Sequence, residues 1–253
     1  RLKMDIIEVR NVSKSFASSD KILKVLDEIN LNVREGEFFV IVGPSGCGKT
    51  TLLKIMHGLI TPDSGEVYID GEKVKGPSSL TAFVFQTSNL FPWRTVLKNV
   101  EFGLEVQKIP DNEKRAIAKK HLETVGLSGF ENFYPRQLSE GMKQRAAIAR
   151  ALAVNPKILL MDEPFASLDA YTRELMQTEL LNIWEKFKKT VVFVTHSIDE
   201  AIFMGDRIAI LSHRPARVLE VLETRIQRPR SEDIKSSSEF LELRKHIWSM
   251  LKH

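Results

Sequence analysis

Nine consecutive residues have the types and the spacing needed to hold phosphate groups. Glycine carries no Cβ, so the backbone at positions 43, 46 and 48 can wrap closely around an anion. The N–H groups and the positive dipole end of a following helix favour the same negative charge. Lys49 can then reach the β- and γ-phosphates of a nucleoside triphosphate, and the Thr50 hydroxyl can ligate Mg²⁺. The pattern GxxxxGK followed by Ser or Thr is matched in full by Gly43, Pro44, Ser45, Gly46, Cys47, Gly48, Lys49, Thr50 and Thr51.

The segments on either side of this loop are those that a phosphate site requires. Residues 38–42 are a short apolar run typical of a buried strand, and residues 52–56 carry helix formers. A glycine turn without a ligand is the alternative, but the strand, loop and helix context favours the phosphate site. Cys47 fits as a small residue filling a loop position, with a redox role as its alternative.

A second chemical feature is a pair of carboxylates at the end of another apolar run, residues 158–161. A carboxylate at the tip of a buried strand beside a phosphate loop can hold Mg²⁺ through water, which suits Asp162. The next carboxylate, Glu163, can take a proton from an attacking water as a general base. By itself the pair is compatible with a solvated loop, whereas next to a complete phosphate loop it indicates hydrolysis.

Composition limits the class of protein. The 253 residues are enough for one large α/β domain or two modest ones. A membrane span needs about eighteen apolar residues, and no apolar run approaches that length. Residues 1–4 do not resemble a signal peptide. The single cysteine excludes an internal disulfide and favours a reducing compartment. The net charge of +4 is spread over mixed blocks, which does not favour a nucleic-acid surface.

The order of the elements indicates one domain over residues 1–253 with a helical part inside it. Strands are expected early in the chain, and a helical subdomain at 89–155 is expected to hold helices at 96–105, 111–125 and 140–154. Residues 227–253 are expected to be a linker, at 227–238, and a helix. The strands are expected at 6–12, 29–33, 38–42, 66–69, 82–85, 158–161 and 191–194. The apolar face of the last helix is expected to consist of Phe240, Leu243, Ile247, Trp248 and Leu251.

Further motifs give the chain a family resemblance. Residues 138–142, Leu-Ser-Glu-Gly-Met, open a helix upstream of the carboxylate pair. From about Met4 to His213 the chain resembles the nucleotide-binding subunits of ABC transporters, whose LSGGQ-type signature corresponds to these residues. The resemblance also matches Gln86 to the Q-loop glutamine, residues 167–169 to the D-loop, His196 to the switch histidine and Phe16 to the aromatic that stacks on adenine.

This resemblance implies a fold and an activity. The fold is α/β, a P-loop NTPase core of the ABC ATPase type with a small antiparallel β subdomain and an inserted α-helical subdomain. The activity is ATP hydrolysis in a homodimer, with ATP and Mg²⁺ as cofactors. Lys49 and His196 stabilise the γ-phosphate, and Thr50, Gln86 and Asp162 organise Mg²⁺. The residues implied to act on the ATP of the opposite subunit are Ser139, Gly141 and Asp169.

The partners implied by the resemblance are transmembrane permease subunits and, indirectly, a solute-binding protein, which places the chain at the cytoplasmic face of the membrane. The segments 86–96, 162–170 and 196–201 are similar to the ATPases of nitrate, sulfonate and taurine importers. The alternatives are the ATPase of an exporter or of a lipoprotein-release system. An ABC ATPase acting on nucleic acid would need a long coiled coil before the signature, but only about ninety residues separate loop and signature.

Several residues keep a second interpretation. Phe16 can be a core aromatic, His196 a structural histidine and Gln86 a turn cap. Phe91 and Trp93 either dock a membrane subunit or are buried in the helical subdomain.

One residue departs from the family pattern, because Glu140 replaces the first signature glycine. A carboxylate about 8 Å from a phosphate would cost about 2 kcal/mol at an effective dielectric of about 20. Pointed away, at the helix N-terminus, it would gain a few tenths of a kcal/mol from the dipole. We expect the second arrangement.

Overall fold

The computed structural model describes residues 5–18 and 21–252 of the chain. Residues 1–4, and with them the start of the family resemblance at Met4, lie outside the described residues. The chain folds into two compact units. The first unit holds residues 1–78 and 188–253, and the second holds residues 79–187.

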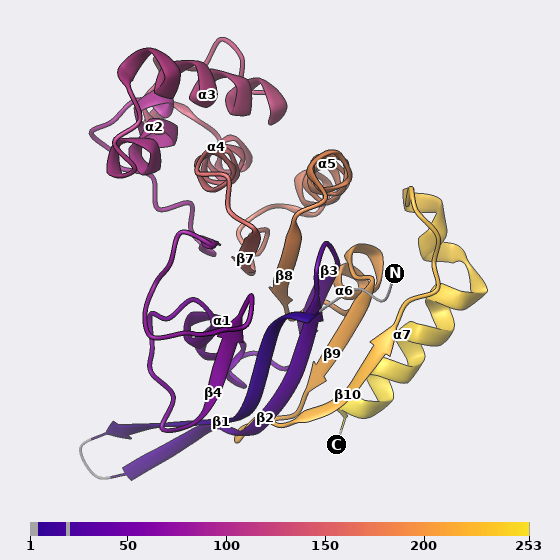
Figure 1. Ribbon diagram of the computed structural model, residues 1–253. Coiled ribbons are helices and arrows are strands. Elements are labelled where there is room, and N and C mark those ends of the chain that lie inside the picture. The colour runs from indigo at the N-terminus through magenta and orange to yellow at the C-terminus, as the bar shows by residue number, and fades with distance from the viewer. Residues whose placement is uncertain (1–4, 19–20, 253) are drawn as a thin grey trace. The chain divides into compact units, whose positions relative to one another are not determined.

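In the first unit, an antiparallel sheet is built on a long two-stranded ribbon (Figure 1). Its strands are longer than the short runs that the sequence predicted, because the pairing passes through irregularities that let the ribbon twist. Asn11 and Glu28, both with φ of 50°, are left-handed residues in the two strands. The end of the ribbon is solvated, with Ile22 81% exposed, so no apolar alternation marks it in the sequence. The sheet has the order β2 (Lys21–Arg34), β1 (Asp5–Ser18), β4 (Ser64–Ile69), β5 (Glu72–Lys73).

A parallel sheet in the same unit carries the phosphate-loop segment. Strand β3 (Phe38–Val42) pairs in parallel with β8 (Thr190–Thr195) on one side and β9 (Arg207–Leu211) on the other. All three strands are buried along their whole length, as expected for strands that are covered on both faces. Strand β10 (Val218–Glu223) continues the sheet antiparallel to β9. The helices of this unit are α1 (Lys49–Met56), α6 (Ile198–Met204), the 3₁₀ helix η2 (Glu232–Ser236) and α7 (Ser238–Leu251).

In the second unit, strand β6 (Thr81–Val84) pairs in parallel with β7 (Ile158–Asp162). The three helices expected between residues 96 and 154 are confirmed, and two of them begin at side-chain caps. The Thr95 and Ser139 hydroxyls each accept a hydrogen bond, from the backbone N–H of Lys98 and of Met142. The helices of this unit are α2 (Val96–Val106), α3 (Asp111–Thr124), the 3₁₀ helix η1 (Pro135–Gln137), α4 (Glu140–Ala153) and α5 (Ala170–Phe187).

The C-terminal helix α7 lies along β10, in the first unit (Figure 1). Phe240 and Ile247 are fully buried, and burying each stabilises the fold by about 1.5–3 kcal/mol. The rest of the apolar face expected from the sequence is not in the core, since Trp248 is 56% exposed. Amphipathicity located the helix but not how much of its face is covered.

The predicted α/β class, with an antiparallel sheet in one part and helices in another, is confirmed. Among the residues that the structure describes, no helix is both long and apolar enough to span a membrane.

Candidate functional site

The phosphate loop joins the end of β3 to the start of α1. Gly46 and Gly48 have φ of 74° and 126°, which side-chain-bearing residues rarely adopt. A Cβ on Gly48 would lie 2.8 Å from Val25 Cγ1, so the loop is packed as well as turned. Gly48 is the N-cap of α1, and because glycine has no side chain it cannot cap the first backbone N–H groups of the helix. A bound phosphate can therefore accept from the first turn of α1.

The lysine of the loop is held within it. Lys49 is 4% exposed, and its Nζ donates to the carbonyl oxygens of Gly43 at 2.8 Å and Pro44 at 2.9 Å. An ammonium group at this position, next to the N-terminus of a helix, suits an anionic ligand. The loop thus fits the phosphates of a nucleotide. Burial raises the pKa of the Cys47 thiol, which stays protonated and fits the packing role expected for it.

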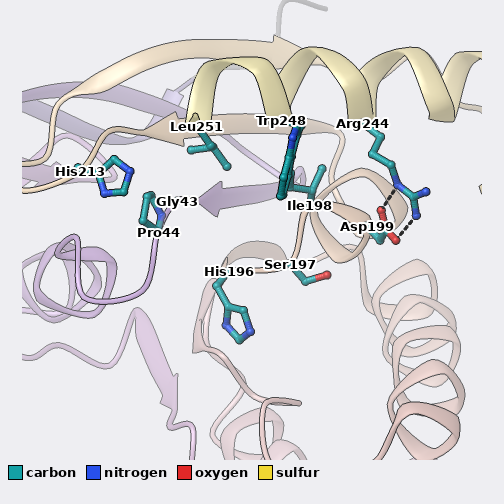
Figure 2. A pocket seen from close by; sticks show the side chains of 10 residues that line it. All are labelled: Gly43, Pro44, His196, Ser197, Ile198, Asp199, His213, Arg244, Trp248 and Leu251. Atoms are coloured by element: carbon teal, nitrogen blue, oxygen red, sulfur yellow. Dashed lines mark hydrogen bonds and ion pairs between the residues drawn. The ribbon is translucent and has the colours of Figure 1, made fainter. Parts of the chain in front are cut away.

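The switch histidine stands at the same sheet edge as the loop. Val42 and Thr195 are register partners in the parallel pairing of β3 with β8, so Gly43 and His196 leave the sheet side by side. Both residues, together with Pro44, line one cavity of about 490 Å³ (Figure 2). His196 is exposed rather than packed in a core. Its position therefore favours ligand contact over the structural interpretation.

The residues that flank His196 are tied together. The Thr195 hydroxyl donates to Glu200 Oε2, and the Ser197 backbone N–H donates to Thr195 Oγ1 at 2.9 Å. Ser197 caps α6 by accepting from the Glu200 backbone N–H at 3.3 Å. No role was predicted for Thr195, which ends β8 just before the histidine, or for Glu200, which lies in the family-like segment 196–201, because neither residue carries a motif of its own.

The predicted adenine-stacking residue lies on the antiparallel sheet. Phe16 is 40% exposed, so it is not a core aromatic. The Lys14 ammonium lies 5.6 Å from the centre of its ring and is paired with Asp63 at 2.7 Å. A partly exposed ring of this kind can stack on a base.

In the second unit, Gln86 and the carboxylate pair leave the sheet at one edge. Val84 and Met161 are register partners, with β6 ending at Val84 and β7 ending at Asp162. Asp162 is 6% exposed, whereas Gln86 lies on the surface. Glu163 has a φ of 43°, an uncommon conformation for a residue with a side chain.

The three residues predicted to act on a second subunit's ATP are connected in the second unit. Ser139 is the N-cap of α4, and Gly141 lies in the first turn. A Cβ on Gly141 would lie 3.1 Å from the Thr172 Cγ2 methyl. Thr172 in turn donates its N–H to Asp169 Oδ1 at 3.0 Å and its hydroxyl to Asp169 Oδ2 at 2.7 Å. These hydrogen bonds lower the pKa of the Asp169 carboxyl.

The predicted residues are thus divided between the two units. The first holds Phe16, the phosphate loop and His196, and the second holds Gln86, Ser139, Gly141, Asp162, Glu163 and Asp169. No group of three or more His, Cys, Asp or Glu side chains that could hold a metal is found among the described residues. Magnesium is usually held by one or two protein side chains together with substrate phosphates. Thr50, Gln86 and Asp162, the residues predicted to organise Mg²⁺, each carry a side-chain oxygen of the type that Mg²⁺ binds.

Comparison with known proteins decides the family. The family model for the ABC transporter matches residues 26–166. The chain belongs to the ABC transporter ATP-binding proteins. It is 55% identical over 252 residues to an uncharacterised member, MJ0412 of Methanocaldococcus jannaschii, with 100% of this chain and 93% of the relative covered. It is 46% identical over 241 residues to the aliphatic sulfonates import ATP-binding protein SsuB of Bacillus cereus, with 95% of this chain and 94% of the relative covered.

The solved structures agree with this assignment. A dimeric post-hydrolysis structure of the ATP-binding cassette MJ0796, bound to ADP and Pi, matches with a TM-score of 0.77 and 39% identity. The match covers 87% of this chain and 100% of the cassette. The predicted fold class and ATPase activity are confirmed, with ATP and Mg²⁺ as cofactors.

Two side chains of this ABC ATPase that the sequence analysis did not single out hold the segment after β6. Arg150 of α4 donates to the carbonyl oxygens of Asn89 at 2.8 Å and Ser88 at 2.9 Å. Gln144 of the same helix donates to the Phe85 carbonyl at 3.4 Å. Burial lowers the pKa of the Arg150 guanidinium. The helix that begins at the signature therefore also holds the Q-loop backbone.

Glu140, which departs from the family pattern, lies in the first turn of α4. Its carboxylate pairs with Lys143 Nζ at 2.6 Å, one turn along the same helix. The side chain of Glu140 is 60% exposed. At the helix N-terminus, this negative charge is in a favourable position, as expected for the second arrangement.

Proposed function

We propose that this chain is the ATPase of an importer that takes up a small solute of the nitrate, sulfonate and taurine class. The observation that carries the proposal is the similarity to the SsuB sulfonate import proteins, at 44–46% identity over nearly the whole of both chains. An exporter or lipoprotein-release ATPase is the alternative, because the relative at 55% identity has no stated substrate.

Glu163 is the general base in this proposal. It follows a buried strand and the carboxylate of Asp162, which is where a base beside a metal site is expected. Its left-handed backbone, at φ 43°, costs about 1–2 kcal/mol for a residue with a Cβ. Strain of this kind tends to persist at sites where it aims a functional side chain. This local geometry supports the role of Glu163.

The other residues bind and orient the nucleotide. Lys49 and His196 stabilise the γ-phosphate, and Phe16 stacks on adenine. Bound Mg²⁺ neutralises phosphate charge, with Thr50, Gln86 and Asp162 as its protein partners. The loop geometry around Lys49 and the exposure of His196 and Phe16 support these assignments.

Two copies of the chain complete each site in this proposal. Ser139, Gly141 and Asp169 act on the ATP of the second copy. The contacts of Gly141 and Asp169 with Thr172 support a shared role, and the similar cassette MJ0796 has been solved as a dimer. The remaining partners are permease subunits at the cytoplasmic face of the membrane and, through them, a solute-binding protein.

The test of the catalytic assignment is Glu163→Gln, which keeps the shape of the side chain and removes its basicity. ATP binding is expected to persist while hydrolysis falls at least about 100-fold, the lower end of general-base effects. With ATP, light scattering is expected to detect a dimer that dissociates when ATP is removed. Glu123→Gln, on the exposed face of α3, is the matched control. If Glu163→Gln hydrolyses ATP within about threefold of the wild-type rate, Glu163 is not the general base.

The direction of transport needs the assembled complex. Reconstituted with its permease subunits in a membrane, the ATPase of an importer is expected to be stimulated by a solute-loaded binding protein. An alkanesulfonate, taurine and nitrate are the solutes to compare. Stimulation by a solute on the ATPase side of the membrane, with no binding protein, would favour the exporter.

A further inference from the structure

The C-terminal helix is attached to the start of α6, the helix that follows the switch histidine. Arg244 of α7 donates to both carboxylate oxygens of Asp199, from Nε to Oδ1 at 2.6 Å and from Nη2 to Oδ2 (Figure 2). Asp199 is in the first turn of α6. A two-point contact between a planar guanidinium and a carboxylate fixes orientation as well as distance. The first turn of α6 is therefore held in register with α7.

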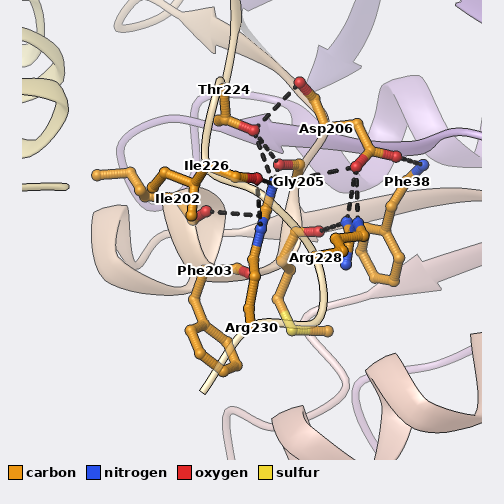
Figure 3. Close-up of polar contacts among 10 residues, drawn as sticks. Phe38, Ile202, Phe203, Gly205, Asp206, Thr224, Ile226, Arg228 and Arg230 are labelled. Atoms are coloured by element: carbon orange, nitrogen blue, oxygen red, sulfur yellow. Dashed lines mark hydrogen bonds and ion pairs between the residues drawn. The ribbon is translucent and has the colours of Figure 1, made fainter. Parts of the chain in front are cut away.

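The other end of α6 is attached to the segment that precedes α7. Arg230 is 6% exposed, and its Nη1 donates to the carbonyl oxygens of Ile202 at 3.1 Å, Phe203 at 2.9 Å and Gly205 at 2.8 Å (Figure 3). The last carbonyls of a helix have no partner within it, so this guanidinium serves as a cap. Arg228 adds a bond to the Met204 carbonyl at 2.6 Å. The polar stretch 227–238, which was expected to be a linker, thus binds the end of α6 through Arg228 and Arg230.

Helix α6 in turn holds both neighbours of His196 through one residue. Glu200 accepts from the Thr195 hydroxyl, and its backbone N–H donates to the Ser197 hydroxyl at 3.3 Å. Glu200 and Thr195 are both buried. A movement of α6 is therefore passed to the residues on either side of His196.

Helix α7 itself lies across a cavity from the histidine. The cavity, of about 490 Å³, is lined by His196 on one side and by Arg244, Trp248 and Leu251 of α7 on the other (Figure 2). Hydrogen bonds connect the two through α6, from Arg244 to Asp199 and from Glu200 to Thr195 and Ser197.

We propose that residues 224–251 position His196 for ATP hydrolysis through α6, with Arg244, Asp199 and Glu200 as positioning residues. The inference rests on the role of His196 in the proposed function. Exposed ion pairs add little to stability, so the Arg244–Asp199 contact is expected to act mainly through orientation. Small displacements of a group that contacts the reacting phosphate are costly in rate.

The kinetic test uses the full chain and breaks the contact without touching the nucleotide residues. Arg244→Ala is expected to lower kcat about three- to tenfold and to leave KM for ATP within about twofold. The reversed pair, Asp199→Arg with Arg244→Asp, is expected to restore kcat to within about twofold of wild type. The matched control is Glu223→Ala, which removes the exposed Arg34–Glu223 ion pair on β10. An unchanged kcat in Arg244→Ala, or a loss equal to that of the control, would overturn the proposal.

A spectroscopic readout separates positioning from a general loss of stability. The chain has six histidines, so histidine-selective ¹⁵N labelling gives few resonances, and His196→Asn identifies that of His196. The His196 resonance is expected to shift in Arg244→Ala and in Thr195→Val, which removes the hydroxyl bound to Glu200. It is expected to stay in place in Glu223→Ala. A fixed His196 resonance in Arg244→Ala and Thr195→Val, with both variants folded, would refute the positioning route.

The same variants separate this inference from the role of His196 itself. If His196→Asn hydrolyses ATP at the wild-type rate, while the His196 resonance of the chain that keeps His196 still responds to Arg244→Ala, the assignment of His196 fails and the mechanical link stands. If His196→Asn is inactive and Arg244→Ala has wild-type kcat, the link to hydrolysis fails. If Arg244→Ala does not fold, Arg244→Lys and the reversed pair take its place. Positioning would be refuted if Arg244→Lys kept the wild-type kcat and the wild-type His196 resonance while the reversed pair failed to restore kcat.

Discussion

Gly141 of the signature lies directly against Thr172 of α5, at a distance where a Cβ on Gly141 would be 3.1 Å from the threonine methyl. The same threonine holds Asp169 through two hydrogen bonds, at 2.7 and 3.0 Å. The absence of a side chain at position 141 is therefore what lets the signature helix approach the D-loop. Both segments are expected to move as one block toward a second subunit.

Gly141→Ala is expected to reduce hydrolysis and ATP-driven dimer formation about tenfold, because the new methyl pushes Thr172 and with it Asp169. Steady-state ATPase and light scattering measure the two effects. The second change Thr172→Ser removes the opposing methyl, keeps the hydroxyl and is expected to restore most of the activity. Gly76→Ala, where a Cβ meets nothing within 4 Å, is the control. Equal activity in Gly141→Ala and Gly76→Ala would show that the close approach is not needed.

Phe16→Ala is expected to weaken ATP binding about tenfold, within the range measured when an aromatic that stacks on a base is removed. Its ring is 40% exposed, so the thermal midpoint is expected to change little. Phe16→Tyr keeps the stacking surface and the affinity. Ile22→Ala, which removes an 81% exposed side chain from the same ribbon, is the control. Calorimetric titration with a non-hydrolysable ATP analogue measures the affinities, and an unchanged affinity in Phe16→Ala would place adenine elsewhere.

The stability of the protein is expected to fall in mild acid because of His57, the C-cap residue of α1. Burial lowers the pKa of this imidazole below its usual value of 6.5, so the folded state favours the neutral form. The unfolded chain takes up the proton first as the pH falls below 6.5, and this contribution to stability is then lost. Thermal midpoints measured from about pH 7 to about pH 5 are expected to fall less steeply in His57→Gln. Parallel curves for the two proteins would refute this assignment.

Much of the candidate site could be predicted because its signals are local in the sequence. The phosphate loop needs glycines at fixed positions, and a carboxylate after a buried strand is recognisable from a few neighbouring residues. Glu163 was found in this way, but its left-handed backbone was not, because glutamate carries no preference for that conformation.

The contacts that could not be predicted depend on residues far apart in the chain. Arg230 lies in a polar stretch, and it is buried only because the end of α6 presents carbonyl oxygens to it. Helical periodicity predicted that Trp248 faces the core, whereas the tertiary structure places a cavity there. The long β1–β2 ribbon was missed since its solvated end has no alternating apolar pattern.

The final prediction concerns docking to a membrane subunit through the segment after the Q-loop. Trp93 is 72% exposed, which removes the interpretation of this residue as core. Phe91 is half-buried, and its ring makes an edge contact with Phe102 at 4.7 Å between centroids. The two aromatics are therefore expected to have different roles, with Phe91 as the support and Trp93 as the anchor. Exposed aromatics of this kind are favoured anchors at protein interfaces.

Trp93→Ala is expected to leave the ATPase of the isolated subunit and its thermal midpoint unchanged while assembly with the permease fails. Phe91→Ala is expected to lower stability by about 1–2 kcal/mol, since it loses a partly buried ring and its aromatic contact. Val106→Ala, at 69% exposure on α2, is the control for removal of exposed apolar area. Co-purification with the permease subunits measures assembly. If Trp93→Ala co-purifies as well as Val106→Ala does, the membrane subunit docks elsewhere, because an interface anchor contributes at least about 1 kcal/mol when truncated.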